Sequence, residues 1–367
     1  MAQLLVGAGK FYCSNAVSSS ALKPNHNQSM THTTFFAQLR AHLLSLAIFF
    51  IAILSMQPIQ AQGLKLASDV YPPFTDVSGE KAIAMEIVQG VLERMEQEVG
   101  FAIVDFEDVI NGVREGRFDG SAALWHSNER EDLMYFSAPY MENRLVLVGR
   151  KGSNIDYKKL DDLVGKNVGI VGGYAYGLDA GAGVILIATK SDQQSLSQLL
   201  SGKLDYILVD ALVISYMLKY LTNDVSALLE IGQEPFMRKG LHFALSREVQ
   251  GGGQLVKQFD KHYREMLAEG KINEILGMTA IRADVTGDGK LELVLSGSKV
   301  GSAPDPSAYA LTLVPPTRGA GAERIYHEGK LYEGWGDLPR SLKQEPDSQM
   351  KPEDAGIKIK LSRSGGR

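Results

Sequence analysis

The sequence predicts an α/β protein made of two similar lobes and a smaller C-terminal extension. The chain has 367 residues, enough for about two domains at roughly 150 residues each. Hydrophobic residues make up 44% of the chain and charged residues 22%, which are ordinary values for a folded globular protein. From residue 64 onward, short apolar runs alternate with segments of helical apolar spacing, a pattern typical of strands layered with helices.

The first of these segments is a short strand over Leu64–Ser68, followed by a turn at YPPF, residues 71–74. Residues 82–99 carry apolar side chains at helical spacing along one face, which predicts a helix with one buried side. The elements predicted next are a strand around 102–105, a helix around 107–115, and strands around 119–124 and 145–148.

Three later apolar runs are bounded by glycine or polar residues, which is typical of buried parallel strands. They are residues 168–171, 184–188 and 206–209. The remaining helices are predicted at 195–200, 212–221 and 255–267.

One pattern occurs twice, at residues 110–124 and 197–211. Each copy runs from a helix through a glycine, a basic residue, an apolar residue and an aspartate into a strand. Gly116 and Gly202 are expected to end their helices in the left-handed conformation, and Asp119 and Asp205 to open the next strands. The pattern is either a coincidence between two strand–helix–strand units or a sign of two lobes, each with a small parallel sheet. Ligands of such sheets lie outside the carboxyl ends of the strands.

The N-terminal segment has the composition of an export signal. Residues 1–61 contain three basic residues and no acidic one, and Arg40 precedes an apolar run over 43–56. That run is shorter than the ~20 residues of a membrane span and fits the apolar region of a signal peptide. Cleavage is expected after Ala61, and Met30 is a better start than Met1 for a signal peptide of ordinary length. An uncleaved membrane anchor is the alternative.

Charge and cysteine content exclude several classes of function. The net charge of −5 provides no basic excess for binding nucleic acid. Cys13 is the single cysteine, so an intramolecular disulfide and a cysteine-based zinc site are both impossible. No nucleophile elbow, zinc motif or phosphate-binding loop is present in the sequence.

A set of short motifs spans residues 64–277. They are YPPF (71–74), EGRFDG (115–120), SNER with FSAPY (127–130 and 136–140), LDDLVGKNVGIVGG (160–173), GKLDYILVDALVISY (202–216) and AEGKINEILG (268–277). In order and spacing these motifs resemble the family 3 extracellular solute-binding proteins, the polar-amino-acid-binding type. The resemblance implies the type II periplasmic binding protein fold, in which two α/β lobes joined by two crossovers close on a small ligand.

The resemblance also implies an organisation and a function. Lobe 1 is expected at 62–149 and 236–278, lobe 2 at 150–235, and the extension at 279–367, flexible beyond Lys343. The crossovers are expected near 150–153 and 235–240. The implied function is a periplasmic receptor, a monomer without enzymatic activity, that takes a small amino-acid-like or carboxylate ligand for transport or sensing. Its partner would be a membrane permease or a sensor.

The family's ligand-binding positions fall on specific residues here. Arg130 is expected to clamp a carboxylate, Asp210 to meet an ammonium group, and Tyr71 and Phe106 to stack on the ligand. Arg130 as a surface arginine, Asp210 as a helix cap, and the two rings as core residues are the alternatives.

The chain departs from the family at two places in this site. Trp125 stands where a small hydroxyl residue is usual, with Ser127 two residues later, and Tyr174 with Ala175 replaces a Ser-Thr pair after Gly173. These changes add an indole and a phenol to the site, which favours flat or cationic ligands.

The C-terminal extension contains DVTGDGKLE, residues 284–292. Its oxygen-bearing side chains have the spacing of the ligands in a calcium loop, and Gly289 allows the sharp turn. The segment resembles the calcium loops of FG-GAP-type repeats. Leu295 stands where an EF-hand needs a glutamate. The expected calcium ligands are Asp284, Thr286, Asp288, the carbonyl of Lys290, and Glu292; no other cofactor is expected. A polar β-turn between 280–283 and 291–295 is the alternative.

Two further functions remain open at this point. One is an enzyme on the same fold, similar to the family's dehydratase relatives, with Glu86, His126 or Asp210 as the acid or base. The other is a sensor or interaction module that docks a partner through the C-terminal segment.

Overall fold

The computed structural model describes residues 63–75, 82–178, 183–220, 225–276, 278–296 and 324–343. The export signal, the cleavage position and the chain beyond Lys343 lie outside these residues. The described part contains one sheet of ten strands and a second sheet of four strands. The predicted α/β alternation is confirmed.

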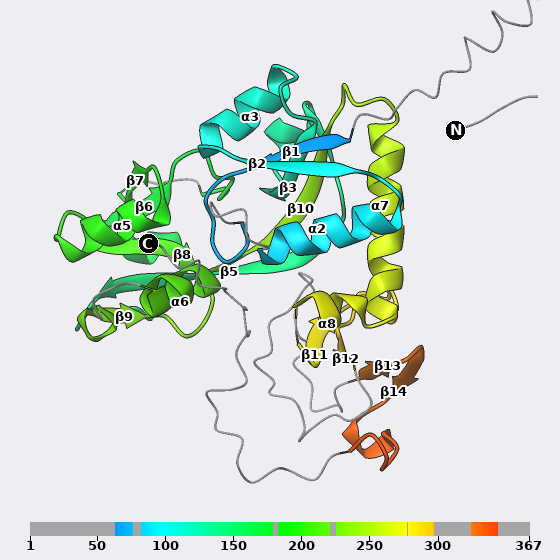
Figure 1. Ribbon diagram of the computed structural model, residues 1–367. Coiled ribbons are helices and arrows are strands. Elements are labelled where there is room, and N and C mark those ends of the chain that lie inside the picture. The colour runs from blue at the N-terminus through cyan, green and yellow to red at the C-terminus, as the bar shows by residue number, and fades with distance from the viewer. Residues whose placement is uncertain are drawn as a thin grey trace, which may run out of the picture. The chain divides into compact units, whose positions relative to one another are not determined.

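The first lobe is built around β1 (Leu64–Ser68), which has the bounds that the sequence predicts. β1 lies parallel between β2 (Val99–Ile103) and β3 (Gly120–Trp125), and β4 (Met134–Phe136) and β10 (Met237–Ser246) complete this lobe. Its helices are α2 (Ile83–Arg94), α3 (Phe106–Arg114), α4 (Asn128–Glu131), α7 (Gly252–Ala268) and α8 (Lys271–Leu276). α7 stands beside α2, and α3 covers β1 and β3 (Figure 1).

The second lobe repeats the parallel arrangement. β6 (Asn167–Val171) lies parallel between β7 (Ile185–Thr189) and β8 (Tyr206–Asp210), and the short β9 (Leu229–Ile231) pairs with β5 (Met141–Arg150). α5 (Asp192–Leu200) packs on β6 and β8, and α6 (Ala211–Tyr220) packs on β5 and β8. Two 3₁₀ turns, Leu160–Leu163 and Ser226–Leu228, complete it.

The repeated sequence pattern has the same structure in both lobes. Gly116 and Gly202 have φ values of 72° and 80°, the left-handed conformation that glycine adopts without strain. The Asp119 carboxylate accepts a 2.7 Å hydrogen bond from the backbone N–H of Lys65, and that of Asp205 accepts one of 2.9 Å from Asn167. Each aspartate therefore ties its strand to the neighbouring first strand, and the two-lobe interpretation holds.

The two parallel groups belong to one sheet, not to two separate small sheets as expected. β5 (Met141–Arg150) is long enough to pair antiparallel with β10 over Met141–Leu145 and with β8 over Leu145–Gly149. The partner changes at Leu145, which is opposite both Met237 and Asp210. β10 was missed as a strand because its sequence mixes charged and apolar residues. The expected crossover and domain boundaries stay predictions.

Ion pairs join β5 to β10. The buried Glu142 accepts hydrogen bonds from Arg144 at 2.8 Å and from Arg238 at 2.5 Å. Arg144 and Arg238 lie directly opposite each other in the register of the two strands. Glu142 therefore reduces the repulsion between two arginines that lie opposite each other across the ladder.

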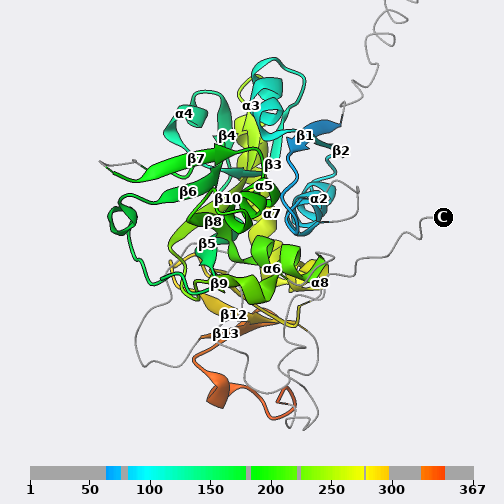
Figure 2. The same ribbon diagram turned by 90° about the vertical axis from the view of Figure 1, so that its left-hand side faces the viewer.

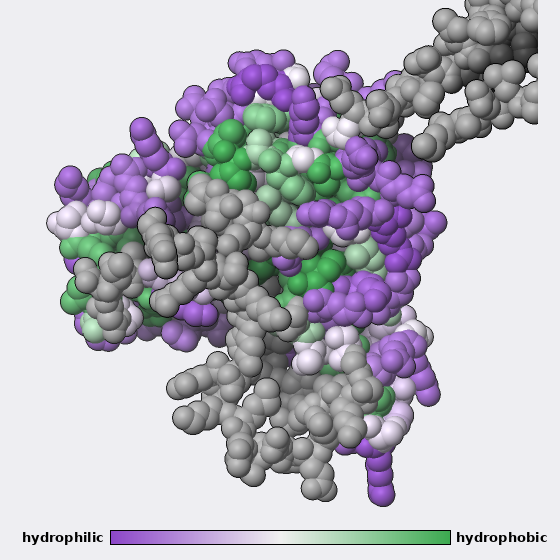
Figure 3. All heavy atoms as spheres, viewed as in Figure 1, coloured by the Kyte–Doolittle hydropathy of each residue, from purple (hydrophilic) through white to green (hydrophobic). Residues whose placement is uncertain are grey.

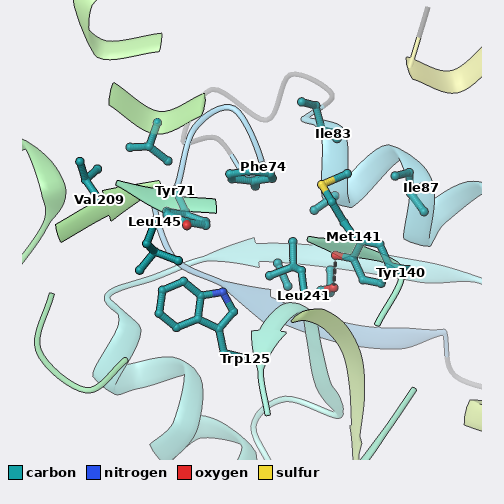
Figure 4. Close-up of a cluster of buried hydrophobic side chains, with 14 of the residues drawn as sticks. Tyr71, Phe74, Ile83, Ile87, Trp125, Tyr140, Met141, Leu145, Val209 and Leu241 are labelled. Atoms are coloured by element: carbon teal, nitrogen blue, oxygen red, sulfur yellow. Dashed lines mark hydrogen bonds between the residues drawn. The ribbon is translucent and has the colours of Figure 1, made fainter. Parts of the chain in front are cut away.

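Apolar side chains from both lobes form one continuous core. Figure 4 shows Met141 and Tyr140 near α2, and Leu145 and Trp125 nearer the second lobe. The buried Tyr140 hydroxyl donates to the Ala122 carbonyl at 2.8 Å, which satisfies a polar group that burial would otherwise penalise. Hydrophilic side chains cover the outer side of α7 in Figure 3. None of the described helices combines the length and apolar composition of a membrane span.

The C-terminal extension forms the four-stranded sheet β11 (Ala280–Ala283), β12 (Glu292–Leu295), β13 (Ile325–His327) and β14 (Lys330–Tyr332), followed by a 3₁₀ turn at Trp335–Asp337. β12 and β13 lie side by side and parallel (Figure 2). Residues of β12 alternate between two cores, as strand geometry requires: Val294 joins the main core, and Leu293 and Leu295 join a small separate one. The Asn273 amide of α8 donates to the Val294 carbonyl at 3.0 Å.

Candidate functional site

A small cavity lies between the two lobes. Five of the residues predicted to bind a ligand line it, namely Tyr71, Phe106, Trp125, Arg130 and Tyr174, together with Asp69, Ala123, Ala175 and Leu241. Its volume of about 20 Å³ has room for about one water molecule. Side chains therefore fill most of the space between the lobes at this site.

The lining residues come from the carboxyl ends of parallel strands. Asp69 follows β1, Trp125 ends β3, and Tyr174 follows β6 by a short turn through Gly173. Phe106 is the first residue of α3, and Arg130 lies on α4 just after β3. This is where open parallel sheets bind their ligands.

Tyr174 lies at the centre of an aromatic cluster. Its ring makes edge contacts with Tyr71, Phe106 and Trp125 at centroid distances of 5.8, 4.7 and 5.1 Å. All three rings belong to the first lobe, whereas Tyr174 belongs to the second. Its aromatic contacts therefore join the lobes.

Arg130 is 8% exposed and also joins the lobes. Its guanidinium donates to the Trp125 carbonyl at 2.6 Å and to the Gly173 carbonyl at 2.8 Å, and lies 5.2 Å from the centre of the Phe106 ring. Burial lowers the pKa of Arg130 to about 10, against the opposing effect of Glu129 and Asp69. Arg130 therefore stays a cation at neutral pH, and the alternative of a surface arginine is wrong.

Asp69 is the functional candidate that the sequence analysis missed. Its carboxylate accepts a 2.5 Å hydrogen bond from the Tyr174 hydroxyl. Burial raises the pKa of Asp69 to about 6, although the Tyr174 hydroxyl and Arg130 oppose this rise. Its position directly after β1, at the carboxyl end of a parallel strand, is the signal that could have identified it.

A hydrogen bond from the chain segment between the lobes positions the Trp125 ring. The Trp125 indole N–H donates to the Asn143 side-chain carbonyl at 2.7 Å, and both residues are buried. The Lys239 ammonium lies 6.0 Å from the centre of the same ring and donates to the Tyr176 carbonyl at 3.1 Å. Both strands that connect the lobes therefore contact the Trp125 ring, β5 through Asn143 and β10 through Lys239.

The family model of the bacterial extracellular solute-binding proteins, family 3, matches residues 64–277. The chain belongs to this family. Family 3 solute-binding proteins are receptors for small molecules, so the expected receptor function is confirmed at this level. The small C-terminal sheet begins at Ala280, beyond the matched residues.

Several similar proteins have names or titles that state a ligand. The L-cystine-binding protein TcyA of Bacillus subtilis (strain 168) is 26% identical over 211 residues, which cover 56% of this chain and 76% of that protein. A putative ABC transporter arginine-binding protein 2 of Escherichia coli (strain K12) is 25% identical over 177 residues, 46% of this chain and 72% of that protein. These relatives give the dehydratase-like alternative no support.

The solved structure of an ancestral arginine-binding protein bound to arginine has a TM-score of 0.51 and 24% identity, and the match covers 59% of this chain and 96% of that one. At this identity the likeness is one of fold. It confirms the type II periplasmic binding protein architecture that the sequence predicted for this solute-binding protein.

Asp210 has a different environment from the one expected. It is 1% exposed, and its carboxylate accepts hydrogen bonds from the backbone N–H groups of Arg144 at 2.8 Å and Leu212 at 2.7 Å. The second of these bonds is the capping contact of a residue that precedes a helix. Asp210 does not line the cavity, and its predicted contact with an ammonium group has no support in this geometry.

Two further predicted residues lie at the edge of the site. Ser127 precedes α4 at its N-cap position and is outside the cavity lining. Gly173 has a φ of 81°, and a Cβ there would lie 3.1 Å from the Phe106 ring. Glycine is therefore required both by the turn and by the close approach. Whether any of these residues contacts a ligand stays a prediction.

The predicted calcium loop connects β11 and β12 as a hairpin, which agrees with the alternative of a polar turn. Oxygen atoms of Asp284, Asp288 and Glu292 gather within 4.8 Å of one another. Arg324, directly before β13, donates to both Asp288 oxygens at 2.8 Å and also to Glu292. The guanidinium already pairs with two of these three carboxylates, Asp288 and Glu292, so a calcium ion there would have to displace Arg324. Calcium binding stays a prediction.

Proposed function

We propose that this solute-binding protein is an extracytoplasmic receptor that closes on an amino-acid-like ligand, with the ligand carboxylate paired to Arg130. The observation that carries the proposal is the position of Arg130. It is a buried cation in the lining of the interlobe cavity, and its guanidinium lies over the Phe106 ring.

The chemistry of such a cavity suits a small zwitterion. A buried ligand carboxylate would cost several kcal/mol without a partner, and the fixed guanidinium supplies one. Arg130 uses two of its N–H groups on backbone carbonyls of Trp125 and Gly173, and opening of the lobes would free the second of these for the ligand. The aromatic walls supply apolar contact for the rest of the molecule.

Binding requires the lobes to separate first, because the closed cavity is too small for an amino acid. The contacts that separate include the hydrogen bonds of Arg130 with Gly173 and of Tyr174 with Asp69, and the ring contacts of Tyr174 with the first lobe. A ligand that bridges both lobes then stabilises a closed state by population shift. Such a receptor delivers its solute to a permease of the ABC transporter type, as the names of its relatives suggest.

A ligand screen tests this proposal. The mature chain, beginning at Gln62, is heated with each of the common L-amino acids and with L-cystine, and the unfolding temperature is recorded. We expect a saturable rise for a small subset of related amino acids, confirmed by calorimetric titration. A flat response to the whole set, with stabilisation by molecules that lack a carboxylate, would contradict the proposed function.

Expression of the full chain, with residues 1–61 included, tests export. N-terminal sequencing of the protein recovered from the periplasm should give Gln62 or a residue within a few positions of it. A mature protein that retains the apolar run at 43–56 would support the membrane-anchor alternative.

A further inference from the structure

The outermost strand of the first lobe has a free edge among the described residues. The larger sheet begins with β2, which pairs with β1 alone of the described strands and lies outside it in Figure 2. On either side of β2, the Glu98 carbonyl and the Val104 N–H bond to β1 at 2.8 and 3.0 Å. Because bonding residues alternate along a strand, the N–H groups of Val99, Phe101 and Ile103, the outer amides of β2, point away from β1, as do their carbonyls. This edge is a template for one more strand.

An acidic hollow lies at the start of this edge. Its three glutamates are exposed, and none of them forms an ion pair with another described residue. Arg94, which is adjacent in sequence, pairs with Glu265 and Glu269 of α7 instead. The hollow therefore offers its carboxylates to a basic segment. Its lining residues are Gln89, Glu93, Glu96, Gln97, Glu98 and Val99.

The C-terminal part of the sequence contains a segment with a matching pattern. Residues 357–363 read IKIKLSR, in which three apolar side chains alternate with lysines. This alternation predicts a strand with one apolar and one basic side. Residues 356–367 contain four basic residues and no acidic one, so their charge is complementary to that of the hollow.

The intervening chain is long enough to bring this segment to β2. Thirteen residues lie between Lys343, where the described part ends, and Ile357. Thirteen extended residues span up to about 45 Å. For comparison, the 17 residues of α7, which runs along the side of the first lobe (Figure 1), span about 25 Å.

The other edges of the two described sheets suit a basic strand less well. β11 and β14 contain Arg282 and Lys330, and Lys190 directly follows β7. Each of these edges would place a basic residue beside a basic segment, which is unfavourable. β2 carries no charged residue over 99–103 and begins next to the glutamates.

We propose that residues 357–361 add to β2 as an antiparallel strand, with Arg363 and Arg367 at the acidic hollow. The charges set the direction, because only an antiparallel strand brings its basic C-terminal end to the start of β2. The added strand covers an edge that would otherwise invite pairing between molecules. It also ties the chain beyond the small sheet to the first lobe.

The register follows from the side-chain pattern. Ile359 lies opposite Phe101, and Arg363 lies opposite Gln97, which lines the hollow. The apolar side of the added strand then falls on the face of β2 where Val99 and Phe101 pack on the main core. Backbone hydrogen bonds supply affinity and the alternating side chains supply specificity, as in other cases of strand addition.

Residue-resolved hydrogen exchange of the mature chain, Gln62–Arg367, tests this strand. The outer amides of β2 should exchange at least about tenfold more slowly in the wild type than in Ile359→Pro, because proline has no N–H for the ladder. Gln349→Pro, outside the alternating segment, is the matched control and should keep wild-type protection. The N–H groups of Gly100 and Ala102 bond to β1 in every variant and report that the lobe is folded.

Charge reversal tests the direction of the strand. Glu93→Lys combined with Glu98→Lys should speed exchange of the outer amides about three- to tenfold, since exposed ion pairs are individually weak. Adding Arg363→Glu and Arg367→Glu to the same chain should restore slow exchange. Failure of the second pair to restore it would overturn the antiparallel arrangement.

Two further measurements decide the occupant of the edge. A synthetic peptide of residues 356–367, added to Ile359→Pro at about millimolar concentration, should restore slow exchange of the outer amides, which a misfolded variant could not show. Equal exchange of the outer amides in the wild type and Ile359→Pro would overturn the proposal. Protection that rises with protein concentration, together with a dimer in sedimentation, would assign the edge to a second copy and also overturn it.

Discussion

The Arg130 guanidinium donates a 2.8 Å hydrogen bond to the backbone carbonyl of Gly173, which lies on the opposite lobe. The bond forms only when the lobes are together, because its two residues follow β3 and β6 of different lobes. The same nitrogen-rich group is the one proposed to hold the ligand carboxylate. Arg130 would therefore stabilise both the closed form of the empty protein and the complex with a ligand.

Arg130→Gln should reduce affinity for the amino acids that stabilise the wild type by about ten- to a hundredfold, since a charge-assisted hydrogen bond contributes roughly 1.5–3 kcal/mol. The variant should also lose some stability without ligand, because the Trp125 carbonyl loses a donor. Urea unfolding and calorimetric titration measure the two effects separately. Arg117→Gln, at an exposed arginine paired with Glu115, is the matched control. Unchanged affinity in Arg130→Gln would place the ligand carboxylate elsewhere.

Trp125 offers an optical signal of the site. The chain has two tryptophans, Trp125 in the cavity and Trp335 in the C-terminal extension. Separation of Tyr174 from Trp125, which are in edge contact, should change the emission of Trp125. Titration with a stabilising amino acid should therefore change the fluorescence of the wild type. Trp125→Phe should abolish the change and Trp335→Phe should keep it. The reverse result would locate the ligand near the small sheet.

Stability should depend on pH through Asp69. Burial raises the pKa of Asp69 to about 6 from an ordinary value of 3.8, so the folded protein holds this proton more tightly than the unfolded chain does. The resulting stabilisation is complete below about pH 4 and is lost as the pH rises through about 6. Asp192 and Asp210 shift in the same direction, again because of burial.

We therefore expect the free energy of unfolding without ligand to rise from about pH 7.5 to about pH 5. The free energy of unfolding of Asp69→Asn should rise by about 1–2 kcal/mol less than that of the wild type, because one pKa unit corresponds to ~1.4 kcal/mol. Urea unfolding at the two pH values measures the difference. Equal rises in the two proteins would show that Asp69 is not shifted as described.

Arg324, not an ion, is expected to stabilise the 284–292 loop. It lowers the pKa of Asp288 through its hydrogen bonds, and it neutralises Glu292, which is fully buried. Arg324→Gln should weaken amide protection of β11 and β12 in hydrogen exchange, and Lys330→Gln on β14 serves as the control. A chelator that reduces this protection in the wild type, and has no effect on Asp288→Ala, would instead support the calcium prediction.

The order of elements and much of the cavity could be predicted from the sequence because they depend on local patterns. Leu64–Ser68 is a short, mostly buried strand, and Gly116 and Gly202 mark helix ends by their positive φ. The helix predicted to reach Val99 ends at Arg94 instead. Glu96 there takes a φ of 56°, a conformation that glutamate rarely adopts and that its sequence does not signal.

The errors arise where one residue type serves two purposes. An aspartate after a strand can cap the next helix or meet a ligand, and only the contacts show that Asp210 caps α6 whereas Asp69 lines the cavity. An acidic loop can bind a metal ion or pair with the side chain of an arginine. Arg324 is too far along the chain from the loop to be recognised as its partner. Tyr174 was expected in the cavity, but its hydrogen bond to Asp69 depends on the approach of two lobes.

The pairing of β5 with β10 between the lobes has a mechanical consequence. Because the two strands stay hydrogen-bonded along Met141–Leu145 and are held by Glu142, the lobes can move apart only if this ribbon twists or bends as a whole. A ribbon deformed in this way keeps its hydrogen bonds, so the lobes can open by elastic bending of the two strands without local unfolding. Because the register of the two strands is kept, the lobes can return to the same relative position when the ribbon relaxes.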